Sequence, residues 1–160
     1  MKKKATLKIL FLILLLLSVT LFMKWNSQLN RNTRDLEKKL TTSGAQVSGK
    51  TAELFDFDYD VLYVFEPYES KEKMENKIGF RTSILQETVS EGMMNILFVK
   101  ENSPVAYLYG YPTNTGYFIE MPSGKYRKNE LDLVQYNKSM SDVGNSSGTP
   151  ITFIRYTFEM

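Results

Sequence analysis

The most uneven distribution of apolar and polar residues lies at the N-terminus, where a basic segment precedes a long apolar run. Residues 9–23 read ILFLILLLLSVTLFM, and only Ser18 and Thr20 interrupt this run. At ~1.5 Å per residue, a helix that begins a few residues earlier nearly crosses a hydrocarbon core of ~30 Å. We therefore predict a transmembrane anchor over residues 9–23, with a cleaved signal peptide as the alternative.

Flanking cations predict the orientation of this anchor, because cytoplasmic flanks carry an excess of Lys and Arg. Residues 1–8 carry four lysines, whereas Lys24 and Arg31 are the only cations in the first ten residues that follow the apolar run. The pattern predicts a single-pass protein of the cell membrane, with residues 1–8 in the cytoplasm. The lipid bilayer is then the partner of residues 9–23, and the rest of the chain is extracytoplasmic.

Residues 24–50 are polar and predict a stalk or linker between the anchor and a domain over residues 51–160. The stalk contains six basic and two acidic residues, for a net charge of +4. The domain contains 10 basic and 16 acidic residues, for a net charge of −6. A domain of that charge is a poor candidate for binding nucleic acid.

Alternating apolar positions predict several strands in the domain, together with one helix. Residues 55–65 alternate as a strand, and residues 70–78 read as a helix between the cap Ser70 and the stop Gly79. A hairpin, two further strands at 116–121 and 131–136, a loop over 137–150 and a last strand follow. The predicted fold class is α+β: an N-terminal transmembrane helix, then one helix packed on a mostly antiparallel sheet of four to six strands.

The composition narrows the possible chemistry, since the chain has neither Cys nor His. Without these residues there is no disulfide, no Cys/His zinc site and no Ser-His-Asp or Cys-His catalytic arrangement. We therefore predict a protein that is not an enzyme and uses no cofactor.

Two short patterns suggest ligands, and a simpler interpretation competes with each. The stretch GAQVSGKT matches a P-loop through Gly44, Gly49, Lys50 and Thr51, but a polar segment precedes it where a buried strand is required. The spacing of Asp56, Asp58 and Asp60 suggests calcium, although the glycine and the glutamate of a calcium loop are missing. Three carboxylates on the wet side of a strand also explain the second pattern.

Three tyrosines share one face of a predicted strand, at Tyr107, Tyr109 and Tyr111. If exposed, such a ladder is a stacking platform for a glycan or a peptide; if buried, it is ordinary sheet packing. We take these residues as the candidate ligand-binding site of the domain.

The stretches DVLYVFEPYESKEKMENKIGF and ILFVKENSPVAYLYGYP resemble small secreted or membrane-anchored proteins of Gram-positive bacteria. In that group a D-x-L-Y-V-F-x-P-Y strand leads into an S-K-E-x-x-E-x-x-x-G helix, and a hairpin follows. The resemblance covers about residues 58–121 and implies an extracytoplasmic bacterial domain. It implies no activity, substrate or site residues.

Taken together, the patterns favour a membrane-anchored, extracytoplasmic, non-catalytic binding domain of the bacterial envelope. Its partner would be an envelope protein or a glycan, and an immunity or exclusion factor is a more specific version. The alternatives are a cytoplasm-facing nucleotide-binding protein that uses residues 44–51, or a calcium-dependent surface adhesin.

Overall fold

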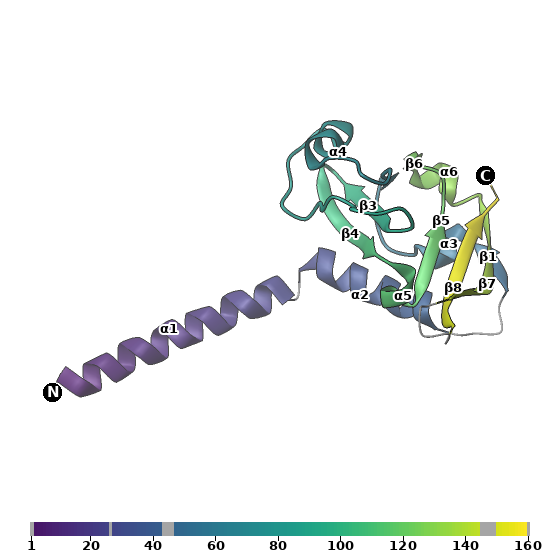
Figure 1. Cartoon of the computed structure of the whole chain (residues 1–160). Helices are drawn as coiled ribbons and strands as arrows, with labels where there is room; N and C mark the ends of the chain where they lie inside the picture. Colours follow the sequence, from purple (N-terminus) through teal and green to yellow (C-terminus); the bar gives the residue numbers. More distant parts are fainter. Residues whose placement is uncertain (1, 26, 43–46, 145–149, 160) are drawn as a thin grey trace.

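A computed structural model describes residues 2–25, 27–42, 47–144 and 150–159, and within α1 it describes the side chains of residues 10–20 and 23. The chain forms six helices and eight strands in these ranges (Figure 1). They are α1 (Lys2–Trp25), α2 (Gln28–Thr41), β1 (Ser48–Lys50), α3 (Thr51–Leu54), β2 (Val61–Val64), α4 (Lys71–Ile78), β3 (Met94–Lys100), β4 (Ser103–Gly110), α5 (Pro112–Thr115), β5 (Tyr117–Glu120), β6 (Gly124–Arg127), α6 (Lys128–Leu131), β7 (Gln135–Val143) and β8 (Ile151–Phe158).

The fold is α+β and contains two four-stranded sheets, whereas the sequence predicted one. The first sheet has the order β4-β3-β2-β6 and is antiparallel throughout. The second has the order β1-β7-β8-β5, in which β5 runs parallel to β8. The strand predicted over 131–136 and the loop predicted over 137–150 are corrected, because α6 ends at Leu131 and β7 continues through Val143. Polar residues on both faces hid this strand, and cross-strand hydrogen bonding to β8 forms it.

The main hydrophobic core combines residues from both sheets and from α2. A second cluster lies on the other face of the β4-β3-β2-β6 sheet, where α4 covers it. Helix α4 begins at the cap Ser70, whose hydroxyl accepts from the Lys73 N–H, and ends at Gly79 with φ 85°. The prediction of this helix is confirmed, as are the β3–β4 hairpin, β5 and β8.

Helix α2 covers the free edge of β4, although its sequence was assigned to a polar stalk. The Asn32 side-chain amide donates to the Val105 carbonyl at 2.9 Å, and the Tyr107 N–H donates to the Thr33 hydroxyl at 3.1 Å. These bonds occupy backbone groups that an edge strand would otherwise present to solvent or to another strand. The helix is therefore a component of the domain.

The domain consequently begins before Thr51, the boundary predicted from the sequence. Leu36 and Leu40 of α2 are buried in the main core, and β1 pairs with β7. The Tyr156 hydroxyl donates to the Leu40 carbonyl at 3.1 Å and ties the end of α2 to β8. The sequence of α2 contains only three leucines at helical spacing and was therefore taken as polar. Two of these leucines nevertheless belong to the main hydrophobic core.

Helix α1 projects away from the rest of the molecule (Figure 1). Its described side chains over residues 10–20 are exposed and mostly apolar. Within the described residues, no helix has the length and apolar character needed to cross a membrane. On this finding the predicted transmembrane helix is wrong, and with it the signal anchor and the single-pass membrane localisation.

Candidate functional site

An exposed tyrosine on a strained turn marks the first part of the candidate site. Tyr68 has φ 61°, and 63% of its surface is exposed. Its N–H donates to the Thr88 hydroxyl at 3.0 Å, which fixes the turn. A non-glycine residue in this conformation costs about 1–3 kcal/mol and persists only where its surroundings impose it, often at functional sites. The chain therefore holds this aromatic ring outward at an energetic cost.

The turn around Tyr68 is closed by the buried carboxylate of Glu69. This carboxylate accepts from the Glu66 N–H at 3.3 Å and pairs with the Lys77 ammonium of α4 at 2.6 Å. The Glu69 N–H donates to the Glu66 carbonyl. The turn is therefore closed by its own hydrogen bonds and held to helix α4 by the ion pair with Lys77.

A network around one buried amide holds the neighbouring loop, residues 86–93. Asn95 is 2% exposed, and its side-chain nitrogen donates to the Gln86 carbonyl at 2.9 Å. The Tyr107 hydroxyl donates to the Asn95 side-chain oxygen at 3.0 Å and accepts from the Gln86 N–H at 3.1 Å. The Tyr109 hydroxyl donates to the Glu87 carbonyl at 2.9 Å. The loop is thus fixed from the strands beneath it.

The predicted tyrosine ladder accordingly supports a loop. The rings of Tyr107 and Tyr109 stack at 5.9 Å, and all three tyrosines are half-buried. Burial raises the pKa of the Tyr107 hydroxyl well above its usual range, so this hydroxyl stays a hydrogen-bond donor. Tyr111 precedes α5, where its carbonyl accepts from the Asn114 and Thr115 N–H groups. The structure leaves no open stacking platform at these positions, but the ladder positions the loop that faces Tyr68.

A groove of about 210 Å³ opens beside this turn and loop, between the two sheets. Pro67 from the turn and Gly92 from the loop lie at its rim, and Val89, 75% exposed, stands on the same loop. Three methionines contribute to its lining together with aromatic and branched side chains, which include Met93, Met94, Met121, Phe118, Phe65 and Val64. Methionine adapts its shape, so a groove of this lining accepts varied apolar groups. We call Tyr68, Val89 and this groove the Tyr68 surface.

The Tyr68 surface was missed by sequence reasoning. The sequence Pro67-Tyr68 after a buried strand shows that a turn follows, but a tyrosine there reads equally as a core residue. The conformation that holds it outward depends on Thr88, twenty residues later.

The three aspartates proposed for calcium have separate partners. Strand β2 begins at Val61, so Asp56, Asp58 and Asp60 precede it on an irregular segment. Within the described residues, no group of three or more acidic side chains is arranged to hold a metal ion. Their partners are, in order, the Lys39 ammonium at 2.6 Å, the Lys100 ammonium and the Glu101 N–H at 2.9 Å.

The segment that matches a P-loop is also occupied by internal contacts. Gly44 lies outside the described residues, Gly49 and Lys50 belong to the three-residue edge strand β1, and α3 has only four residues. The Thr51 hydroxyl is buried and donates to the Val134 carbonyl at 2.8 Å. A P-loop needs a buried strand, a glycine loop whose amides face the phosphates and a threonine available to a metal ion. This geometry gives no support to nucleotide binding.

No family model, curated protein or solved structure matches the chain. The resemblance to small Gram-positive proteins therefore stays a prediction.

Proposed function

We propose that the protein is a non-catalytic binding protein whose α+β domain recognises another protein through the Tyr68 surface. The observation that carries this proposal is the exposure of Tyr68 at φ 61° on a turn whose Pro67 lines the groove. Residues that dominate the binding energy of protein interfaces are enriched in Tyr, Trp and Arg. The cost of holding this ring outward is explained if the ring contacts a partner.

The rigidity of the surface supports this function. The Tyr68 turn and residues 86–88 of the loop are held by hydrogen bonds that involve Thr88, Asn95 and Tyr107. A pre-organised surface loses less conformational entropy when a partner binds. An immunity or exclusion factor, which would act by occupying a partner in this way, stays a more specific prediction.

Photo-cross-linking in the cells from which the protein comes tests the proposal. A photo-reactive residue replaces Tyr68 in the full chain, and the same residue replaces Leu133, which is 86% exposed outside this surface. We expect a cross-linked protein at position 68 only, displaced by excess wild-type chain and not by Tyr68→Ala chain. A cross-link to a glycan would show that the partner is a carbohydrate and not a protein. Equal products at both positions, or no competition by the wild type, would refute binding at this surface.

Contact of residues 9–23 with a lipid bilayer is a separate question from a membrane span, and it stays a prediction. Flotation of the full chain with phosphatidylcholine vesicles tests it, and chain that remains at the bottom of the gradient would contradict it.

A further inference from the structure

We propose that two copies of the chain pair along the outer edge of β7, over residues 139–143. The two strands run antiparallel, with Ser141 of one copy opposite Ser141 of the second copy. This edge shares no residue with the Tyr68 surface, so the inference goes beyond the proposed function. It depends on the open backbone groups of the edge, on the protection of the other strand edges, and on the register that two copies can share.

The outer edge of β7 is covered by β1 only at its start. Their pairing ends at Asn137, and the Lys138 N–H donates to the Val47 carbonyl at 2.6 Å. Backbone groups alternate sides along a strand, so Met140 and Asp142 direct their N–H and carbonyl groups to the same edge as Lys138. Within the described residues, no backbone group pairs with this edge after Lys138.

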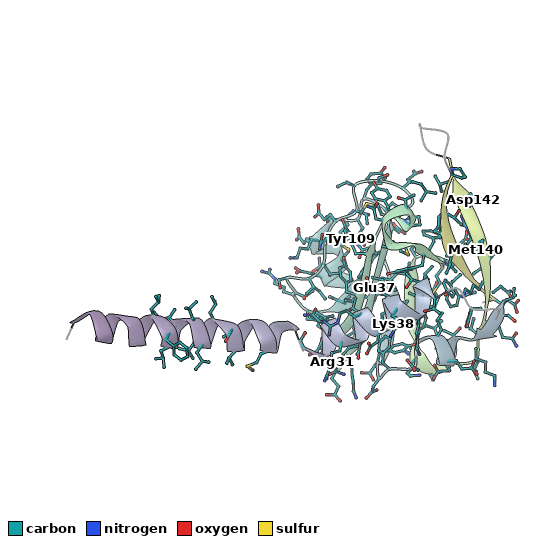
Figure 2. All side chains as sticks on the ribbon, turned by 90° about the horizontal axis from the view of Figure 1, so that it is seen from below. Arg31, Glu37, Lys38, Tyr109, Met140 and Asp142 are labelled. Atoms are coloured by element: carbon teal, nitrogen blue, oxygen red, sulfur yellow. The ribbon has the colours of Figure 1, made fainter. Side chains whose placement is uncertain are left out.

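The side chains of this segment leave the edge open. Met140 and Asp142 lie on the part of the β7–β8 hairpin that projects from the domain (Figure 2). Met140 and Val143 are exposed apolar residues, so a second strand would cover them. Asp142 is the only charged residue over 139–143, and its carboxylate accepts from the Thr152 hydroxyl at 2.7 Å. Lysine, proline and bulges, which block the edges of natural sheets, are absent from this segment.

Other strand edges are short, charged or covered, as is usual in proteins that avoid edge-to-edge association. Helix α2 covers the edge of β4. Strand β6 has four residues, of which Lys125 and Arg127 are exposed cations. Strand β5 also has four residues, and Pro122 follows it closely. Among the strand edges that the structure describes, residues 139–143 therefore form the longest stretch with neither a covering element nor a blocking residue.

The antiparallel registers centred on Met140, Ser141 and Asp142 use this edge, and one of them avoids a conflict. A twofold axis at Met140 requires the Lys138 N–H, which already donates to Val47. An axis at Asp142 places two like charges opposite each other, which is unfavourable. An axis at Ser141 pairs the outward groups of Met140 with those of Asp142 in the second copy, and the reverse. The free edge thus matches itself in length and direction, which favours a second copy as its occupant.

Disulfide trapping in the full chain tests the pairing, because the chain has no cysteine of its own. In this register the two Ser141 Cα atoms lie about 4.5 Å apart, within the range that a disulfide bridges. The two Ser139 Cα atoms lie about 14 Å apart, beyond that range. Under mild oxidation, Ser141→Cys should form a disulfide-linked dimer at least about tenfold faster than Ser139→Cys. Random collision favours the opposite order, since Ser139 is exposed and Ser141 is half-buried.

A proline substitution tests whether the backbone edge is the contact. Met140→Pro removes an N–H that points away from β8, so the hairpin keeps its own hydrogen bonds. Combined with Ser141→Cys, it should slow disulfide formation at least about tenfold relative to Met140→Thr, which keeps the N–H. Thermal melts check that both double variants are folded.

Two results would overturn the inference. The first is an equal rate of disulfide formation at the two cysteine positions, which contact through α1 alone would produce. The second is an equal rate with proline and with threonine at position 140 in folded variants. The comparison of the two cysteine positions does not depend on the proline variant, so it decides the matter even if that variant does not fold.

Discussion

At the scale of single residues, Tyr68 combines an unfavourable backbone conformation with an exposed ring, and two substitutions separate these contributions. Tyr68→Gly removes the ring and the strain, because glycine adopts a positive φ freely. Tyr68→Ala removes the ring and keeps the strain. We expect the glycine variant to be more stable than the alanine variant by about 1 kcal/mol, measured by chemical denaturation. A more stable alanine variant would show that the turn is not strained.

Asn95 is the residue on which the loop over 86–93 depends. Asn95→Ala leaves the Gln86 carbonyl and the Tyr107 hydroxyl without their buried partner, which should cost about 2–3 kcal/mol of unfolding free energy. Tyr107→Phe removes one hydroxyl and should cost less. A double-mutant cycle by urea denaturation measures their coupling, and strictly additive effects would contradict the network.

Glu37 provides a prediction on pH. Burial raises the pKa of Glu37 above its ordinary value of 4.5. The Tyr117 hydroxyl offsets part of this rise, although its contact with Glu37 does not have the geometry of a hydrogen bond. Because the folded-state pKa is the higher one, ionised Glu37 destabilises the fold, and this penalty disappears as the pH falls through that pKa. Glu37→Gln should therefore be more stable than the wild type at pH 7 and lose its advantage near about pH 4.

Thermal melts across this pH range, with Glu101→Gln as the control for a lost charge, check the prediction. An advantage of Glu37→Gln that is independent of pH would contradict it. Glu37 lies on α2, between Arg31 and Lys38 of the same helix (Figure 2).

Some single residues could be assigned from the sequence, because their roles are local. Ser70 caps the start of α4 and Gly79 caps its end, and the contacts that each makes lie within a few positions along the chain. Tyr68 and Asn95 depend on groups from other elements, Thr88 and Tyr107 among them. No periodicity in the sequence indicates such contacts, and the candidate site was therefore missed.

At the scale of elements, α2 decides where the domain begins. A fragment that starts at Thr51 lacks Leu36 and Leu40 of the core and leaves the β4 edge uncovered. We expect residues 51–160 to be unfolded or aggregated at 25 °C, and a chain that starts at Ser27 to fold. Circular dichroism and size-exclusion chromatography of the two fragments check this. Cooperative unfolding of the shorter fragment would restore the boundary at Thr51.

Elements with a regular apolar pattern were predictable, namely α4, the β3–β4 hairpin, β5 and β8. Helix α2 and strand β7 were not, since both are polar and receive their stability from neighbours. Leu36 and Leu40 are the only fully buried side chains of α2, and Met140 of β7 remains 62% exposed (Figure 2). In such elements the tertiary contacts outweigh the local pattern.

At the scale of the whole molecule, two sheets share one core, and their separation at one end leaves the groove of the Tyr68 surface. The sequence predicted the fold class α+β but one sheet, because β5 and β8 were merged with the strands of the first sheet and most of β7 was assigned to a loop. The parallel pairing of β5 with β8 brings Tyr117 beside Ile154, although thirty residues separate the two strands along the chain. Pattern reasoning carries no information on such a pairing.

Calcium should not change the thermal stability of the protein. Because Asp56, Asp58 and Asp60 have separate partners, millimolar calcium should not raise the melting temperature of the full chain. Differential scanning fluorimetry with magnesium as the control checks this. A rise specific to calcium would revive the adhesin interpretation.

The central claim, that the domain binds a protein through the Tyr68 surface, is tested most directly by one affinity measurement. The partner identified by cross-linking is titrated with the full chain as wild type, Tyr68→Ala and Leu133→Ala. An aromatic residue at the centre of an interface is worth 2 kcal/mol or more, so Tyr68→Ala should weaken binding at least about thirtyfold. Leu133→Ala, at an apolar position outside the surface that is more exposed than Tyr68, should change the affinity less than about twofold. Wild-type affinity for Tyr68→Ala, or equal losses in both variants, would contradict the claim.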